Sequence, residues 1–427
     1  MKKNLSRLVA IITMALVFTT AQAQDLLLTG WPYEPDVVNS NLERFTEQTG
    51  ITAEFSPFPS DAYRDRMITS FIGGTEFDLV YVRDSFLPEW VSAGWLQPID
   101  GMPGLDAYLD DMPQAVIDQM SFDGELYGLP YYSGMNVFAY NAAHLEAAGI
   151  DAPPQTWDEL LEQAQIISDA GISDSPIMLQ LQAAQYIMNT LEIVVAGHGG
   201  TLFDASYEPV FAEDGSATRA AIDWIQEGLD AGLIDQASLA AGDSEAVRAI
   251  SAGTHTFTLV ADYNVKTMND PEQSQVAGDV TIGLIPGNGS VDSGTTSYIR
   301  LYGMTADAED PMAAWRLMEF LGGADATGEY YVPNRWALEF GLGFAYTSMY
   351  SDNEIRASLG AWTDPDVLAE QAGYSVNRNY RFVPFFAEWE TDTWGNLQNL
   401  MTGSGNADRT YNQLANDWND LKSEYGY

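Results

Sequence analysis

Cysteine is absent from the 427 residues, and histidine occurs only three times. Without cysteine there is no disulfide framework, thiol nucleophile, iron–sulfur cluster or lipoprotein anchor. His144, His198 and His255 lie far apart in the sequence, and none of them has the spacing of metal ligands. We therefore expect no metal site and no cofactor, and leave open only a structural calcium ion, because Asp and Glu are plentiful.

Positive charge is also scarce. The chain has 18 lysine and arginine residues against 61 aspartate and glutamate residues, which gives a formal charge of −43. Such a surface repels phosphate groups, so nucleic acid is excluded as a partner. Salt screens the repulsion between acidic side chains, and the composition therefore indicates a saline habitat.

The N-terminus has the three parts of a secretory signal peptide. Basic residues precede an apolar run over residues 8–17, and Ala21-Gln22-Ala23 suits a signal peptidase. The apolar run is about half of the ~20 residues that span a bilayer. We expect cleavage to remove residues 1–23 and to leave a periplasmic protein that is not a lipoprotein.

Strand-like and helix-like segments alternate after this signal. Short apolar runs predict strands at 25–29, 51–55 and 77–82, and amphipathic patterns predict helices at 37–48 and 63–72. This β-α-β-α-β order is typical of an α/β fold with ligand chemistry in the loops after the strands. Because 46% of this long chain is hydrophobic, we expect two lobes.

No motif for catalysis stands out. The sequence has neither a G-x-S-x-G elbow nor an H-E-x-x-H pair, and its glycine-rich segments lack the Lys-Ser/Thr of a phosphate loop. Carboxylate pairs are too common in this chain to identify a general acid and a general base. No catalytic residue is predicted, although an exported glycoside hydrolase stays open as an alternative.

Aromatic residues are concentrated at predicted strand ends and loops, where core packing explains them less well. The set consists of Trp31, Tyr33, Phe58, Tyr131, Tyr132, Tyr263, Tyr298 and Trp336. Sugar rings pack their C–H faces on aromatic planes, and their hydroxyls need polar partners such as Asp84 and Asp262. The combination predicts a carbohydrate-binding cleft.

Several segments, in this order and spacing, resemble the extracellular solute-binding proteins of ABC importers. The similarity is to the sugar-binding group that includes maltodextrin- and trehalose-binding proteins. The segments are FDLV at 77–80, LPEW and AGWLQPID within 87–100, DGELYGLP at 123–130, and YN, AAG, PP and TWDEL within 140–160. The resemblance covers nearly all of the chain after the signal.

The resemblance implies two α/β lobes that are joined by crossover segments and hold the ligand between them. It places residues 24–136 and 283–325 in lobe 1, and residues 137–282 and 326–427 in lobe 2. The three crossings are expected near residues 135–138, 280–286 and 322–330. The implied partners are a carbohydrate and the membrane permease of an ABC importer, and a monomer is expected.

The resemblance also implies particular ligand contacts. Asp84, Tyr131, Tyr132, Asp262, Tyr263 and Tyr298 stand where related proteins contact a sugar, and Arg335 or Arg381 would bond further hydroxyls. Two positions depart from the pattern, because Gly134 replaces a frequent aspartate and Tyr263 replaces a frequent tryptophan. These departures leave the identity of the sugar open.

One alternative keeps this fold and changes the ligand. An anionic solute, such as a glycerol phosphate, a sulfonated sugar or a uronate oligomer, would need cations in the cleft. The candidates are Arg83, Arg335, Arg378 and Arg381. A strongly negative envelope slows the capture of an anion, which favours a neutral sugar.

Overall fold

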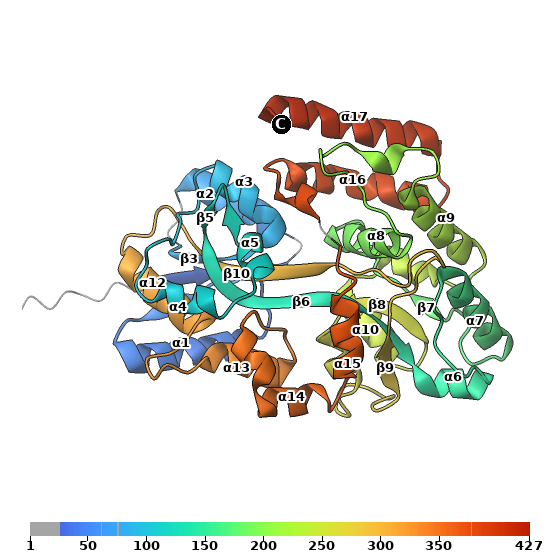
Figure 1. Cartoon of the computed structure of the whole chain (residues 1–427), viewed down its shortest axis with the longest axis horizontal. Helices are drawn as coiled ribbons and strands as arrows, with labels where there is room; N and C mark the ends of the chain where they lie inside the picture. Colours follow the sequence, from blue (N-terminus) through green and yellow to red (C-terminus); the bar gives the residue numbers. More distant parts are fainter. Residues whose placement is uncertain (1–25, 61, 75–76, 377) are drawn as a thin grey trace, which may run out of the picture.

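Two lobes lie side by side in the computed structural model, and one long strand runs through both of them (Figure 1). The structure describes residues 26–60, 62–74, 77–376 and 378–427. The expected signal peptide, residues 1–23, lies outside these described residues. Within them, no helix combines the length and the apolar character that crossing a membrane requires.

Lobe 1 is built around the first five predicted elements. These are β1 (Leu26–Thr29), α1 (Pro35–Thr49), β2 (Ala53–Phe55), α2 (Tyr63–Gly73) and β3 (Leu79–Arg83). The strands at 25–29, 51–55 and 77–82 and the helices between them are thus confirmed, each within two residues at either end. The lobe continues with η1 (Asp84–Phe86), α3 (Leu87–Ser92), α4 (Leu105–Asp110), α5 (Gln114–Gln119), β4 (Ser121–Phe122), β5 (Glu125–Leu126), β10 (Ser297–Met304), α12 (Pro311–Gly322), α13 (Tyr331–Phe340), η4 (Thr347–Ser351) and α14 (Asn353–Leu359).

Lobe 2 contains most of the remaining helices. In chain order its elements are α6 (Ala142–Ala148), α7 (Trp157–Asp169), β7 (Ile177–Met178), α8 (Gln185–Gly197), η2 (Val210–Ala212), α9 (Ala217–Asp230), η3 (Gln236–Ala240), α10 (Asp243–Ser251), β8 (Phe257–Ala261), α11 (Asn264–Met268), β9 (Val280–Gly283), α15 (Pro365–Ala372), η5 (Asn379–Phe382), α16 (Phe386–Met401) and α17 (Ala407–Tyr425). The last helix, α17, lies on the outer side of this lobe (Figure 1).

The strand that joins the lobes is β6 (Gly128–Asn141). Its first part pairs antiparallel with β10, and from Asn136 onward it pairs with β8 and β9 instead. The complete strand order is β2-β1-β3-β10-β6-β8-β7, with β9 also on β6. The change of partner at Met135 and Asn136 coincides with the expected first crossing.

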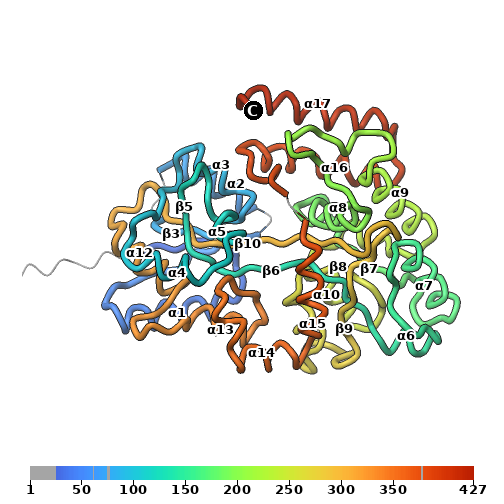
Figure 2. Tube along the Cα trace, in the orientation of Figure 1, coloured from blue at the N-terminus to red at the C-terminus, as the bar shows by residue number. Residues whose placement is uncertain are grey.

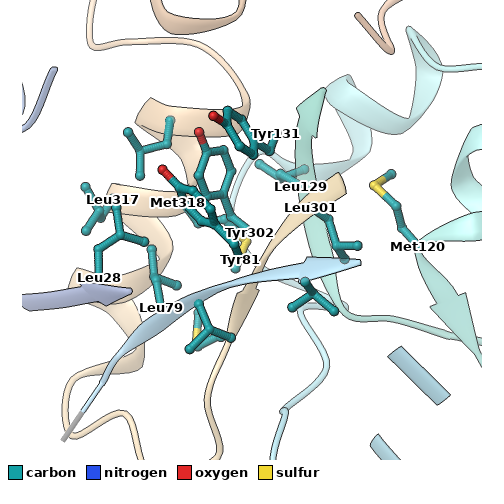
Figure 3. Close-up of a cluster of buried hydrophobic side chains, with 14 of the residues drawn as sticks. Leu28, Leu79, Tyr81, Met120, Leu129, Tyr131, Leu301, Tyr302, Leu317 and Met318 are labelled. Atoms are coloured by element: carbon teal, nitrogen blue, oxygen red, sulfur yellow. The ribbon is translucent and has the colours of Figure 1, made fainter. Parts of the chain in front are cut away.

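Each lobe has a hydrophobic core of its own. The core of lobe 1 includes Leu28, Leu79, Leu129, Leu301 and Leu317, which pack around the sheet of this lobe (Figure 3). Lobe 2 has two adjoining clusters, one around α8, α9, α16 and α17 and the other around β8, β9 and α10. The separate cores allow the lobes to move as units about the strands between them.

The expected lobe boundaries are wrong in two places. Ile285 belongs to the core of lobe 2, and Ser293 bonds to its carbonyl (2.8 Å), so the second crossing lies near residues 295–297 rather than 280–286. Residues 322–330 do not cross, because Asp325 accepts hydrogen bonds from Arg44 (3.1 Å) and Gln48 (3.0 Å) of α1 in lobe 1.

The C-terminal boundary needs the larger correction. Val332, Trp336 and Tyr346 lie in the core of lobe 1, so the segment from α13 to α14 belongs there and not to lobe 2. Leu359 then packs against both cores, and Trp362 lies in lobe 2, which sets the third crossing at 359–362. Figure 2 shows α13 and α14 beneath lobe 1 and α15 across the junction in lobe 2. The apolar face of α13 predicts burial, but it does not specify the core that the helix covers.

Candidate functional site

A cavity of about 310 Å³ lies between the two lobes. Lobe 1 contributes the loop after β1, the end of β3 and the facing parts of β6 and β10. Lobe 2 contributes the segment after β7, the start of α8, the start of α10 and the end of β8. Parallel strands direct their following loops to one edge of a sheet, which is why these segments converge.

Five of the eight predicted aromatic residues line this cavity. They are Trp31, Tyr33, Tyr132, Tyr263 and Tyr298. Tyr263 comes from lobe 2, and its ring lies edge-on to Tyr33 (6.3 Å between centroids) and to Tyr132 (6.2 Å) of lobe 1. Aromatic rings of the two lobes therefore meet at the cavity.

The other three aromatic residues are not part of the lining. Trp336 is only 1% exposed, and Phe58 packs edge-on against Phe77 at 6.0 Å. Tyr131 is 3% exposed and lies between Tyr81 and Tyr302 in the core (Figure 3). The pairing of β6 with β10 is irregular at this point, because Pro130 and Tyr132 pair with Leu301 and Arg300 and leave Tyr131 as the extra residue, whose ring packs into the core.

The two predicted carboxylates are engaged within the protein and do not line the cavity. Asp84 accepts hydrogen bonds from Arg300 Nη1 (3.0 Å) and from the backbone N–H of Ser85 (2.9 Å). Asp262 accepts from the backbone N–H of Tyr263 (3.0 Å). Asp84 thus holds Arg300, which does line the cavity, and Asp262 holds the turn that presents Tyr263.

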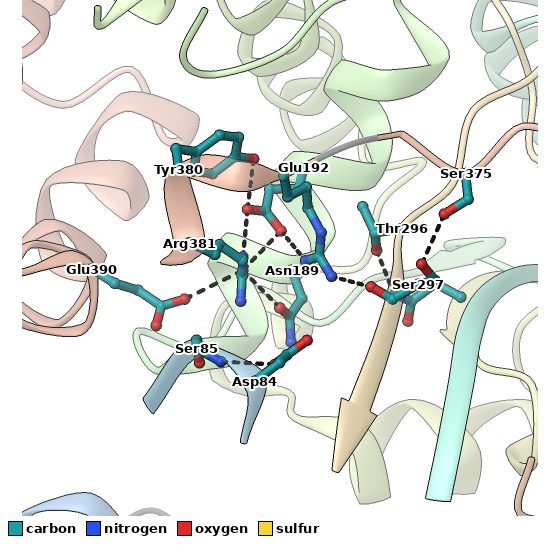
Figure 4. A network of polar contacts seen from close by, with 12 residues as sticks. Asp84, Ser85, Asn189, Glu192, Thr296, Ser297, Ser375, Tyr380, Arg381 and Glu390 are labelled. Atoms are coloured by element: carbon teal, nitrogen blue, oxygen red, sulfur yellow. Dashed lines mark hydrogen bonds and ion pairs between the residues drawn. The ribbon is translucent and has the colours of Figure 1, made fainter. Parts of the chain in front are cut away.

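Arg335 and Arg381 also lie outside the lining. Arg335 bonds Ser40 and Asn41 of α1 and pairs with Glu339 in its own helix. Arg381 is buried in lobe 2, where it pairs with Glu192 and Glu390 (Figure 4). It also donates to Asn189 Oδ1 (3.1 Å), so it positions an amide that lines the cavity.

Several polar residues of the cavity were not predicted. Lobe 2 provides Gln180, Gln185, Tyr186, Asn189 and Asp243, and lobe 1 provides Arg300. The first four follow β7, which is two residues long and too short for its pattern to predict a strand. Amide and carboxylate groups give this side donors and acceptors for hydroxyl groups.

Steric crowding in this site explains why position 134 is a glycine. A Cβ at this position would lie 2.6 Å from Tyr298 Oη and 3.1 Å from Asp262 Oδ1. Any larger residue there would displace Tyr298, which lines the cavity. An aspartate, which the resemblance implies at this position, is therefore excluded here by the tyrosine.

Asp243 is the one acidic residue among the described residues of the lining. It accepts from Asn264 Nδ2 (2.7 Å) and more weakly from Gln180 Nε2 (3.4 Å), yet burial raises the pKa of its carboxyl group to about 6. The folded state binds this proton more tightly than the unfolded state does. Stability therefore falls as pH rises from about 4 to about 6, and the penalty is complete above that range.

Replacing Asp243 by asparagine keeps the acceptor oxygen and removes the charge. We expect Asp243→Asn to raise the free energy of unfolding by up to about 3 kcal/mol at pH 7.5, because two pKa units correspond to about that value. The gain should vanish near pH 4. Urea denaturation at both pH values measures it, with exposed Asp223→Asn as the control. A loss of stability at pH 7.5 would show that the charged carboxylate is favourable in the fold.

Clusters of three or more His, Asp or Glu side chains placed to hold a metal ion do not occur among the described residues. The described residues of the lining instead combine aromatic rings, amides, one carboxylate and two guanidinium groups. This arrangement suits a small polar ligand with hydroxyl groups and an apolar face.

Comparisons with known proteins agree with this geometry. The model of the family described as bacterial extracellular solute-binding protein matches residues 31–328. A mannitol-binding protein of Pseudomonas aeruginosa is 26% identical over 293 residues, which cover 66% of each chain. An erythritol/L-threitol-binding protein of Mycolicibacterium smegmatis is 22% identical over 375 residues, covering 82% of this chain and 74% of the relative.

Solved structures share the fold over almost the whole length. The maltose-bound MalE3 of T. maritima superimposes with a TM-score of 0.82 at 20% identity, covering 93% of this chain and 99% of the other. A solute-binding protein of Agrobacterium radiobacter in complex with ribitol has a TM-score of 0.81 at 15% identity, with 93% and 98% coverage. At these identities the likeness concerns the fold alone.

Proposed function

We propose, on the premise that this chain belongs to the bacterial extracellular solute-binding protein family, that it binds a sugar or polyol between its lobes and delivers it to the permease of an ABC importer. The family is non-catalytic, so the alternative of a glycoside hydrolase is set aside. The site of action is the periplasm, and the protein acts there as a monomer.

The observation that carries this proposal is the cavity itself, because both lobes line it. A ligand that touches both lobes stabilises the arrangement in which they are close together. The crossings at Met135, at residues 295–297 and at 359–362 are the connections about which such a closure would occur. The permease would then distinguish the closed protein from the open one.

The lining supports a hydroxylated ligand of limited size. Tyr33, Tyr132 and Tyr263 offer ring surfaces for C–H groups, while Gln185 and Asn189 offer amides for hydroxyls. About 310 Å³ is at the lower end of the ~300–1,000 Å³ found for ligand pockets. This size favours one or two sugar rings, or a polyol, over a long oligosaccharide.

A thermal-shift screen of the mature chain tests the proposal. The probes are mannitol, ribitol, erythritol, maltose and common monosaccharides, with putrescine as a cation that lacks hydroxyl groups. A ligand at 100 times its Kd should stabilise the folded protein by about 2.7 kcal/mol. A response to putrescine together with none to any sugar or polyol would contradict the proposed ligand class.

A further inference from the structure

Two of the described residues that line the cavity, Arg83 and Arg300, carry guanidinium groups, and the surroundings of these groups differ. Arg300 Nη1 donates to Asp84 (3.0 Å) and to the carbonyl of Ile299 (2.8 Å), so its charge is balanced within lobe 1. Arg83 makes no hydrogen bond or ion pair with any of the described residues, and its Nε is buried without a partner. Arg83 is therefore an unbalanced positive charge that faces the cavity.

Aromatic rings hold Arg83 in place without neutralising it. Its guanidinium carbon lies 5.6 Å from the ring of Trp31 and 5.4 Å from that of Phe86. Burial and the nearby charge of Arg300 lower the pKa of Arg83 to about 10, which leaves it protonated at neutral pH. A fixed and charged group of this kind is prepared to receive an anion.

The same chain balances its other buried cations internally. Arg378 and Arg381 pair with Glu192, and Arg64 pairs with Glu89. Carboxylates outnumber cations by more than three to one in the sequence, so a partner for Arg83 would be easy to supply. A buried charge without a partner destabilises a fold, which suggests that the partner of Arg83 arrives with the ligand.

The opposite wall indicates where the rest of the ligand lies. Asp243 and the amides of Gln180, Gln185 and Asn189 line the lobe 2 side. Asp243 repels an anion but accepts hydrogen bonds from hydroxyl groups. The anionic group therefore belongs at the lobe 1 end, beside Arg83, with hydroxyl groups toward lobe 2.

From this polarity we propose that the natural ligand is a sugar with one negative charge, a carboxylate or a sulfate ester, which pairs with Arg83. The inference rests on the proposed function and narrows its ligand class. One unbalanced guanidinium matches one charge, and two oxygens of either group can accept from its fork of N–H donors. A neutral sugar would leave Arg83 without a partner. The acidic surface slows the approach of such an anion, and salt removes this obstacle by screening.

Matched ligands test the inference on the mature chain by titration calorimetry. Glucose, galactose and mannose are each compared with their uronate and with their 6-sulfate. We expect at least one acid to bind 10-fold to 100-fold more tightly than its neutral partner. The uronate and sulfate arms identify which of the two anionic groups the site takes.

Variants then assign the preference to Arg83. Arg83→Gln should abolish the preference for the acid, whereas Arg83→Lys should keep part of it. Arg335→Gln is the matched control, because Arg335 lies in lobe 1 but outside the cavity, and it should leave the preference intact. The melting temperature of Arg83→Gln should be unchanged or higher, since an unbalanced charge is removed.

The outcomes separate the two proposals. If neutral sugars bind as tightly as their acids, the charged ligand class is overturned. If Arg83→Gln keeps the preference, the pairing of the anion with Arg83 is overturned. The proposed function stands in both cases. If no neutral or acidic sugar and no polyol binds the wild-type chain, both proposals fail.

Discussion

Replacing Glu192 by alanine is expected to lower the free energy of unfolding by about 3–5 kcal/mol, the cost of breaking a buried ion pair on one side. Glu192 lies on α8 and is 3% exposed. Its carboxylate accepts from Arg381 Nε (2.8 Å), Arg378 Nη1 (2.7 Å) and Tyr380 Oη (2.8 Å). The variant would leave two buried guanidinium groups with too little negative charge.

This network connects the hinge region to the cavity (Figure 4). Arg378 also bonds the carbonyl of Ser297, where β10 begins, and Arg381 also bonds Asn189, which lines the cavity. We therefore expect Glu192→Ala to weaken ligand binding in addition to stability. The loss of stability comes more from the removed charge than from the removed volume. Glu192→Gln keeps the volume and some hydrogen bonds, so its free energy of unfolding should fall between those of the wild type and Glu192→Ala.

Urea denaturation of the two variants measures the effect. The control is Glu208→Ala, which removes an exposed ion pair with Lys422 (2.7 Å) and should change stability by less than about 1 kcal/mol. Burial alone would raise the pKa of Glu192, but Arg381 and Arg378 hold it below its usual value. Its stabilising effect is thus present above about pH 4.5 and is lost as pH falls further. Equal costs for Glu192→Ala and Glu208→Ala would refute this account.

The largest effect on binding is expected for Tyr263→Ala. Tyr263 is the aromatic residue through which lobe 2 meets Tyr33 and Tyr132 of lobe 1 at the cavity. Aromatic residues at the centre of an interface commonly contribute 2 kcal/mol or more, which corresponds to a loss of affinity of about 30-fold. Removal of the ring takes away a contact between the lobes and, under the proposed function, a contact with the ligand.

Titration calorimetry with the best ligand from the screen measures the loss. Tyr263→Phe keeps the ring and should stay within about threefold of the wild type. Phe58→Ala, in lobe 1 outside the cavity, controls for general loss of aromatic packing. If Tyr263→Ala binds as tightly as the wild type while its fold is intact, Tyr263 is not a ligand contact.

The local sequence was sufficient for the first five elements of lobe 1. The elements from β1 to β3 follow from apolar runs and amphipathic patterns, because each of them is long enough to show its period. Asp123 and Gly124 form a hairpin turn with Phe122 opposite Glu125 and positive φ at both turn residues, which is the geometry that an Asp-Gly pair favours. These features depend on near neighbours in the chain.

The cavity depended on contacts that are distant in sequence. The sequence suggested Asp84 as a ligand carboxylate. In the fold, Arg300, which lies more than 200 residues later in the chain, donates a hydrogen bond to it. The sequence also suggested Arg381 as a cation of the cleft, but in the fold it forms an ion pair with Glu192. Asp243 showed no signal, since it begins an ordinary helix and acquires its role only where lobe 2 faces lobe 1.

By itself, the sequence determined the α/β class, the resemblance to solute-binding proteins and most of the aromatic residues that line the cavity. Only the tertiary structure decided which face of β6 holds Tyr132, which core receives α13, and which arginine keeps an unbalanced charge. The physical reason is that periodicity and turn chemistry act between neighbours in the chain, whereas the balance of a buried charge depends on every group that the fold brings beside it.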